Sequence, residues 1–116
     1  MDLKNLAPKA QKAEVFLKAL ANRHRLMILC ELHKGERSVS ALQEAIQLSQ
    51  SSLSQHLARL RADDLVKTRR ESQTIHYSLA SDSVTRVIAL LYELYCAEDV
   101  GAKTKTSTAR RKPERP

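Results

Sequence analysis

The stretch from Leu48 to Leu65 carries side chains whose chemistry suits the groove of a DNA duplex. Leu53, Leu57 and Leu60 recur at the spacing of one helical face, which predicts a helix with one buried side. The opposite face is short, polar and free of carboxylates, whereas a solvated face normally mixes Glu and Lys. Amides and hydroxyls bind base edges, and an arginine binds bases or phosphate without the repulsion that an acid would add. We expect DNA contacts from Ser49, Gln50, Ser51, Ser52, Ser54, Gln55 and Arg59.

A basic hairpin is predicted directly after this recognition helix, from Val66 to Leu79. Apolar and polar residues alternate on both sides of residues 71–73, which contain neither Gly nor Pro, so we expect a longer, mobile loop there. The candidates for phosphate or minor-groove contact are Lys67, Arg69, Arg70 and Gln73. Arg70 has an alternative partner in Glu71 or in a second copy of the chain. A helix followed by a hairpin is the order of a winged helix-turn-helix.

Other helices must position this unit, and their start signals are visible in the sequence. Pro8 suits the first turn of a helix, and a second helix ends near Gly35. The expected N-cap residues of the later helices are Asn22, Ser38 or Ser40, Ser49, and Ser81 with Asp82. The spacing from Leu42 to Leu60 then suits a helix-turn-helix.

The last predicted helix is apolar around more of its surface than a monomer can bury. Its apolar positions are Val84, Val87, Ile88, Leu90, Leu91, Leu94 and Tyr95. This excess needs a partner, and a two-fold dimer is the commonest solution. The expected fold is therefore mainly α with a β-hairpin wing, a winged helix-turn-helix that dimerises through its first and last helices.

The length of 116 residues indicates one domain. We expect an N-terminal extension over residues 1–8, a DNA-binding and dimerisation domain over 9–100, and a disordered basic tail over 101–116. Residues 103–116 carry +5 of the net charge of +7, so residues 1–102 carry only +2. Affinity for DNA must then come from local patches, which disfavours a non-specific architectural binder. The tail adds sequence-independent affinity or serves solubility alone.

Several functional classes are disfavoured by what the sequence lacks. No secretory signal begins the chain, and no window approaches the roughly 18 apolar residues of a membrane span, so we expect a cytoplasmic protein without membrane contact. Two glycines leave no phosphate-cradling loop, and no paired carboxylates, His-Glu-x-x-His motif or Ser-His-Asp arrangement can be assembled. We therefore expect no enzyme and no cofactor.

Two cysteines, Cys30 and Cys96, lie far apart in the sequence. A reducing cytoplasm disfavours a structural disulfide, and from composition alone two buried thiols acting as small hydrophobes are the simpler interpretation. His33 follows Cys30 by three residues, so a metal site of Cys30, His33 and Cys96 is a second interpretation. For His56, at the apolar edge of its helix, we expect a structural role.

Residues 20–29, LANRHRLMIL, and residues 48–57, LSQSSLSQHL, together with the hairpin and the last helix, resemble the ArsR/SmtB family of winged-helix repressors. The likeness covers roughly residues 10–98. It implies a dimeric repressor on a pseudo-palindromic operator, with its two recognition helices in successive major grooves.

Two common sensing sites of that family are missing from this sequence. Ser38 and Ser40 stand where many members carry a Cys-x-Cys pair, and a hydroxyl is a poor ligand for soft metals. Other members bind zinc with an Asp-x-His and a later His-x-x-Glu on the last helix. Here Asp82 is followed by Ser83 and Val84, and residues 84–98 contain no histidine.

Cys30 and Cys96 instead resemble the cysteines of a persulfide-sensing subgroup that includes BigR, SqrR and HlyU. The local contexts match, LCEL over residues 29–32 and LYCAE over residues 94–98. The resemblance implies that a persulfide or polysulfide links the cysteines through extra sulfur, and that the repressor then leaves its operator. Such a bridge spans more than the ~7 Å between Cα atoms that limits a disulfide. The alternatives are a metal-responsive repressor using Cys30, His33 and Cys96, or a constitutive regulator without a ligand.

Overall fold

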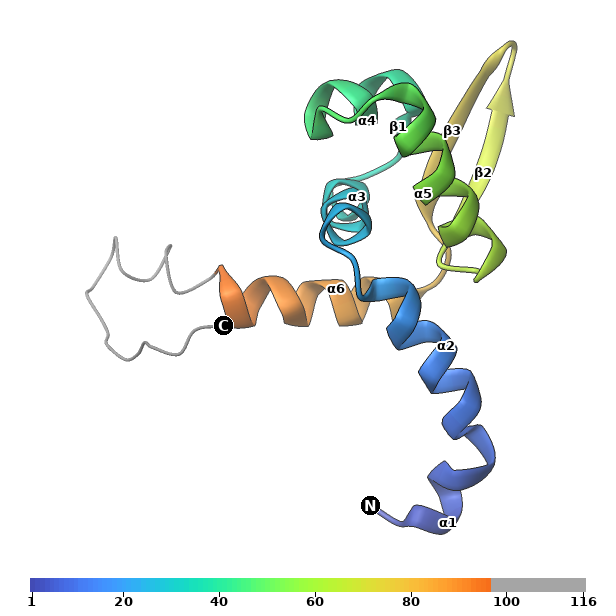
Figure 1. Cartoon of the computed structure of the whole chain (residues 1–116), viewed down its shortest axis with the longest axis vertical. Coiled ribbons are helices and arrows are strands. Elements are labelled where there is room, and N and C mark those ends of the chain that lie inside the picture. The colour runs from blue at the N-terminus through green and yellow to red at the C-terminus, as the bar shows by residue number, and fades with distance from the viewer. Residues whose placement is uncertain (97–116) are drawn as a thin grey trace, which may run out of the picture.

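The computed structural model describes residues 1–96, which form a helical body with a small antiparallel sheet (Figure 1). The elements in chain order are α1 (Leu3–Leu6), the 3-10 helix η1 (Ala7–Lys9), α2 (Ala10–Leu20), α3 (Arg23–His33), β1 (Arg37–Ser38), α4 (Val39–Ile46), α5 (Gln50–Ala62), β2 (Val66–Glu71), β3 (Thr74–Leu79) and α6 (Asp82–Tyr95). The predicted fold class, mainly α with a hairpin wing, is confirmed. The end of the predicted domain and the predicted basic tail lie outside the described residues.

The later helices begin at the side chains that the sequence predicts as caps. Asn22 accepts hydrogen bonds from the backbone N–H groups of His24 and Arg25 at 2.9 and 3.1 Å. The other cap residues, Ser38, Ser49 and Ser81, each accept one from the backbone N–H three residues later. Of the two candidates for α4, Ser38 is therefore the cap and Ser40 is not. These bonds satisfy N–H groups that have no partner within the helix.

The core lies where α3, α4, α5 and α6 meet. Leu53, Leu57 and Leu60 of α5 are at most 2% exposed, as their spacing predicts. They lie in one buried cluster with Ile28, Leu29 and Leu32 of α3, Leu42 of α4, and Val84 and Ile88 of α6. Each fully buried leucine contributes roughly 1.5–3 kcal/mol, so this cluster fixes α5 with its polar face outward.

The sheet has the order β1-β3-β2, and every pairing is antiparallel. In the wing, Val66 pairs with Leu79 and Glu71 with Thr74, so only Ser72 and Gln73 form the turn. The expectation of a longer loop is wrong. Ser72 has a φ of 56°, the positive value that a two-residue hairpin turn requires, although no glycine is present.

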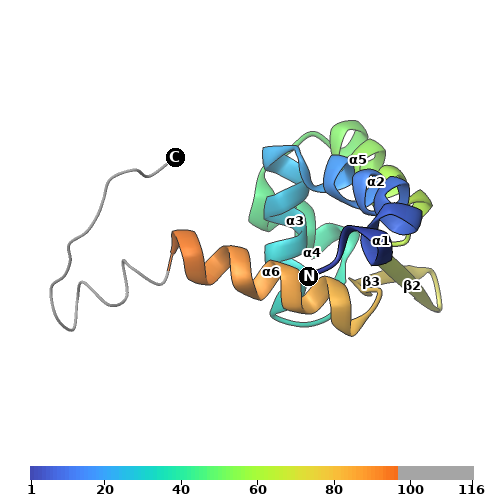
Figure 2. The same cartoon turned by 90° about the horizontal axis from the view of Figure 1, so that it is seen from below.

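Two parts of the molecule extend away from this body. Figure 1 shows α1 and α2 projecting from one side of the body, and Figures 1 and 2 both show the far end of α6 projecting from another. Both parts carry exposed apolar side chains, Leu3, Leu6, Val15 and Leu17 on the first and Leu90, Tyr92, Leu94 and Tyr95 on the second. The apolar excess predicted for the last helix is confirmed. No helix within residues 1–96 is long and apolar enough to cross a membrane.

Candidate nucleic-acid interface and thiol pair

The polar face of α5 lies open to solvent because the leucine face is buried. The preceding helix α4 ends at Ile46, and its C-cap residue Gln47 has a left-handed φ of 64°, which turns the chain toward α5. The Gln43 side chain donates to the Leu48 carbonyl at 3.4 Å across this turn. The predicted DNA-contacting residues of this segment are all exposed except Ser52, which is half-buried: Ser49, Gln50, Ser51, Ser52, Ser54, Gln55 and Arg59. The face therefore presents hydroxyl and amide groups that can bind base edges.

One member of this face is already paired. The Nε of Arg59 donates to the Asp63 carboxylate at 2.7 Å, and Asp63 is the C-cap residue of α5. The face predicted to be free of acid therefore has a carboxylate at its end. Arg59 must exchange this partner for phosphate or a base if it contacts DNA.

The wing holds a second engaged arginine. Arg69 donates to both carboxylate oxygens of Glu36 at 3.1 and 2.8 Å and to Glu71 at 3.3 Å. These hydrogen bonds and charges lower the pKa of Glu36 and raise that of Arg69. The suggested pairing of Arg70 with Glu71 is wrong, because Arg69 takes that partner. Within residues 1–96, Lys67 and Arg70 make no ion pair, and both are exposed, as is Gln73.

The sequence did not reveal a contact that Arg25 makes between α3 and α2. Arg25 donates to the carbonyls of Ala19 and Lys18 at 2.6 and 3.1 Å, which ties the start of α3 to the end of α2. The rings of His24 and His56 lie beside it, with centroids 5.7 Å apart. Burial lowers the pKa of His56, and the charges of Arg25 and His24 lower it further. Arg25 lies in α3 and its carbonyl partners lie in α2, so the periodicity of one helix cannot predict this contact.

The two thiols lie on neighbouring helices. Cys30 of α3 is half-buried at the edge of the core, and Cys96 caps α6 with its N–H donated to the Tyr92 carbonyl at 2.7 Å. Burial raises the pKa of the Cys30 thiol, and the charge of Cys96 raises it further. Since α3 packs against α6, the two sulfur atoms interact electrostatically within one protomer. Neither cysteine is in a disulfide.

The predicted metal site does not form within one chain. Among residues 1–96, no three side chains of His, Cys, Asp or Glu come close enough together to hold a metal ion. His33 is exposed, whereas Cys30 and Cys96 are half-buried. The interpretation of Cys30, His33 and Cys96 as a metal site in one protomer is therefore wrong.

Known proteins share this sequence and fold. Residues 22–68 match the family described as bacterial regulatory protein, arsR family. The chain is similar to the transcriptional activator HlyU of Vibrio cholerae, with 52% identity over 96 residues that cover 83% of this chain and 89% of HlyU. It is also similar to the solved structure of the transcriptional repressor BigR of Xylella fastidiosa, with 34% identity and a TM-score of 0.77 over 83% of this chain and 98% of that one.

A third relative is described as the homodimeric winged helix-turn-helix DNA-binding domain of Mb0332 from Mycobacterium bovis, a possible ArsR-family transcriptional regulator. It shares 30% identity and a TM-score of 0.72, and 96% of each chain is covered. The predicted winged helix is confirmed, and these relatives are transcriptional regulators rather than enzymes. The chain therefore belongs to the ArsR family of bacterial regulatory proteins.

Proposed function

We propose that this chain is a homodimeric repressor that binds a pseudo-palindromic DNA operator and releases it when a persulfide or polysulfide links Cys30 to Cys96. The observation that carries the proposal is geometric: Cys30 lies on α3, Cys96 is the C-cap residue of α6, both side chains are half-buried, and α3 packs against α6.

Binding to DNA is supported by the exposed polar face of α5 and the basic wing beside it. Gln55 is the best base reader on this face, since an amide can bond adenine through two hydrogen bonds. We assign phosphate or minor-groove contact to Lys67, Arg70 and Gln73 of the wing, and to Arg69 once it leaves Glu36. The two recognition helices of a dimer would enter major grooves about one helical turn apart.

Dimer formation is supported by the two projecting apolar surfaces. A groove of about 430 Å³ on α1 and α2 includes three small alanines in its lining, which consists of Leu6, Ala10, Ala13, Glu14, Leu17, Lys18 and Ala21. Small side chains allow another helix to approach closely. The exposed Leu90 and Leu94 of α6 supply the apolar surface that a second copy would cover. The homodimeric relative Mb0332 agrees with this assembly.

The proposed linkage needs no oxidant other than the inducer. Each cysteine thiolate attacks the outer sulfur of one persulfide, RSSH, and releases RSH once a proton is taken up, so that both cysteines become persulfides. The terminal sulfur of one cysteine persulfide then attacks the inner sulfur of the other and expels hydrogen sulfide. Two thiols and two RSSH thus give one trisulfide, two RSH and one H₂S, and all atoms balance. The trisulfide joins Cys30 to Cys96.

The link would act through the packing of the helices. The helix of Cys30, α3, contacts both α6 and the recognition helix α5. Tying α3 to the end of α6, in the proposed dimer interface, changes the distance between the two recognition helices. A full reversal from mostly bound to mostly released requires about 5.5 kcal/mol of differential stability, which a covalent bridge can supply.

The test is fluorescence anisotropy on the DNA upstream of the gene, with reduced protein and with protein treated with glutathione persulfide. We expect release by persulfide, recovery with reductant, and no release of the Cys30→Ser or Cys96→Ser variant, each of which still binds DNA. Peroxide and zinc serve as parallel treatments. Release of either serine variant by persulfide would contradict the proposal, and indifference of the wild type to every treatment would indicate a constitutive regulator.

A further inference from the structure

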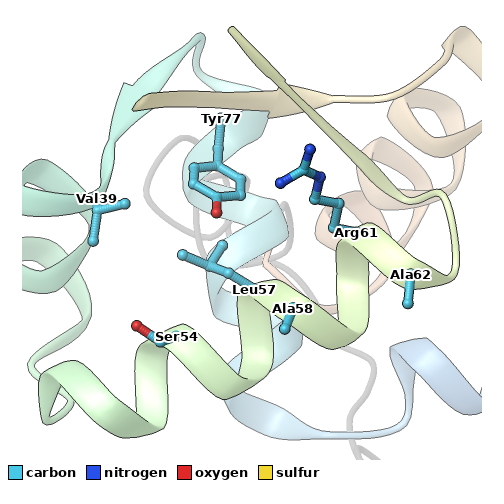
Figure 3. A pocket seen from close by; sticks show the side chains of 7 residues that line it. All are labelled: Val39, Ser54, Leu57, Ala58, Arg61, Ala62 and Tyr77. Atoms are coloured by element: carbon cyan, nitrogen blue, oxygen red, sulfur yellow. The ribbon is translucent and has the colours of Figure 1, made fainter. Parts of the chain in front are cut away.

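A groove lies between the recognition helix and the wing, on a side of α5 where Ser54 is the one predicted DNA contact. It has a volume of about 500 Å³. Figure 3 shows Tyr77 extending from β3 and Arg61 extending from α5 toward the sheet, with Ser54 further along the helix. The remaining wall is apolar and includes Val39, Leu57 and Ala58.

The polar groups at this groove are suited to an anion. Within residues 1–96, the guanidinium of Arg61 makes no ion pair, whereas those of Arg59 and Arg69 are held by carboxylates. The lining includes no Asp or Glu side chain, and Ser54 and Tyr77 add two hydroxyl groups. A guanidinium presents its donors in a planar fork that matches two phosphate oxygens, and the hydroxyl groups can donate to the same oxygens.

The position of the groove indicates where such an anion would come from. Its lining includes Ser54 and Ala58, which are exposed on α5 beside Gln55 and Arg59, and its other wall includes Tyr77 of β3, the strand that leads back from the wing. A duplex with α5 in its major groove and the wing in the neighbouring minor groove must carry one sugar-phosphate strand between the two elements. A strand on that path would cross this groove.

We propose that the groove is a clamp for one backbone phosphate of each operator half-site, with Arg61 as the charged group and Tyr77 and Ser54 as hydroxyl donors. The clamp rests on the proposed function as a DNA-binding dimer. The apolar wall of Leu57 and Ala58 would contact a deoxyribose, which is the uncharged part of the same strand. The contact fixes the register of the protein on the duplex and carries no sequence information.

The first test compares Arg61→Ala with Arg86→Ala, which removes the same charge from an exposed position on α6. For Arg61→Ala we expect affinity to fall about tenfold or more for the operator and by a similar factor for a scrambled duplex. Affinity should also depend less steeply on salt: the slope of log affinity against log salt should become less negative by about 0.9 for each of the two half-sites. Arg86→Ala should leave both quantities as in the wild type.

Two further variants separate charge from geometry. Arg61→Lys keeps the positive charge but loses the planar guanidinium that binds two phosphate oxygens at once. The salt slope should therefore equal that of the wild type while the affinity falls. Tyr77→Phe removes only the hydroxyl, so affinity should fall on both duplexes with the slope unchanged. Circular dichroism and the melting temperature of each variant establish that the fold persists.

The second test replaces single phosphates of the operator by neutral methylphosphonates. One position in each half-site should weaken binding of the wild type about tenfold and leave Arg61→Ala unaffected, because the variant has already lost that contact. Equal behaviour of Arg61→Ala and Arg86→Ala would overturn the clamp while leaving the proposed function intact. Wild-type protein that binds no duplex would overturn the proposed function itself.

A small-molecule site is the outcome that would replace the clamp. The probe for such a site is benzoate, a small organic anion. The groove would be an effector pocket if benzoate displaced DNA from the wild type but not from Arg61→Ala, and if Arg61→Ala kept the wild-type salt slope. A loss of affinity confined to the operator, with the scrambled duplex unaffected, would mean that Arg61 reads a base, and this too would contradict the clamp.

Discussion

At the scale of single residues, the thiol of Cys30 is unusual because its surroundings disfavour the reactive form. Burial is the larger cause of its raised pKa, and Cys96 is the next. Only the thiolate attacks sulfur, so less of Cys30 is reactive at neutral pH than in the unfolded chain. The raised pKa therefore slows every reaction of the Cys30 thiol near neutral pH, including its attack on a persulfide, and this attack should quicken as pH rises.

The pKa direction predicts how alkylation of Cys30 depends on pH. The rate should rise with pH to a midpoint that lies above that of the urea-unfolded chain, because the folded state binds the thiol proton more tightly. In Cys96→Ser the midpoint should move toward that of the unfolded chain, because the charge of Cys96 is gone. It should remain above that value, because Cys30 is still partly buried. Iodoacetamide labelling followed by peptide mass spectrometry measures both. A midpoint in Cys96→Ser at or below that of the unfolded chain would contradict this account.

The pair of Arg69 and Glu36 predicts a gain of DNA affinity on mutation. Glu36→Gln removes the carboxylate charge that accepts two hydrogen bonds from Arg69, so this cation is held only by the exposed Glu71 and can exchange it for phosphate. Affinity for any duplex should rise, and the salt slope should steepen by about 0.9 per protomer. Glu93→Gln, the same change at an exposed position on α6, is the control. Weaker binding by Glu36→Gln would mean that the pair instead positions the wing.

At the scale of elements, the features that depend on neighbouring residues were predictable. The caps at Asn22, Ser49 and Ser81 and the leucine face of α5 follow from local hydrogen bonding and helical period. The features that the sequence did not reveal depend on distant residues. Arg69 and Glu36 are 33 residues apart in the sequence. The two residues of β1 form a strand because they pair with β3, and no local pattern predicts this pairing.

The choice of Ser38 over Ser40 as the cap of α4 can be tested by a matched pair of variants. Ser38→Ala should lower the free energy of unfolding by about 1 kcal/mol, because the N–H of Ala41 loses its acceptor. Ser40→Ala should change it by no more than about 0.5 kcal/mol, because Ser40 is exposed in the first turn of the helix. Urea denaturation measures both, and equal losses would contradict the assignment.

At the scale of the whole molecule, the projecting helices link assembly to binding. The body alone can place one recognition helix on DNA, while α1, α2 and α6 extend beyond it with apolar side chains exposed (Figure 1). The proposed two-fold dimer would cover these surfaces and set the spacing between recognition helices. The sequence predicted the excess apolar surface of α6, but the groove between α5 and the wing required the fold, because its walls come from three separate elements.

Dimerisation through α6 predicts the effect of charges on its exposed apolar positions. The double variant Leu90→Lys and Leu94→Lys should be monomeric by light scattering and should bind a full operator at least about 100-fold more weakly, because the second half-site is no longer linked. Ala89→Lys, on an exposed position of the same helix, should remain dimeric. A double variant that stays dimeric would move the interface away from this part of α6.

The most direct test of the central claim joins mass and affinity on one sample. Wild-type protein treated with glutathione persulfide is divided between intact-mass spectrometry with peptide mapping and anisotropy on the upstream DNA. We predict a Cys30–Cys96 bridge, with the mass of one added sulfur less two hydrogens, in the same fraction of molecules that has lost DNA binding. Full release without such a bridge, or full bridging with binding retained, would contradict the account.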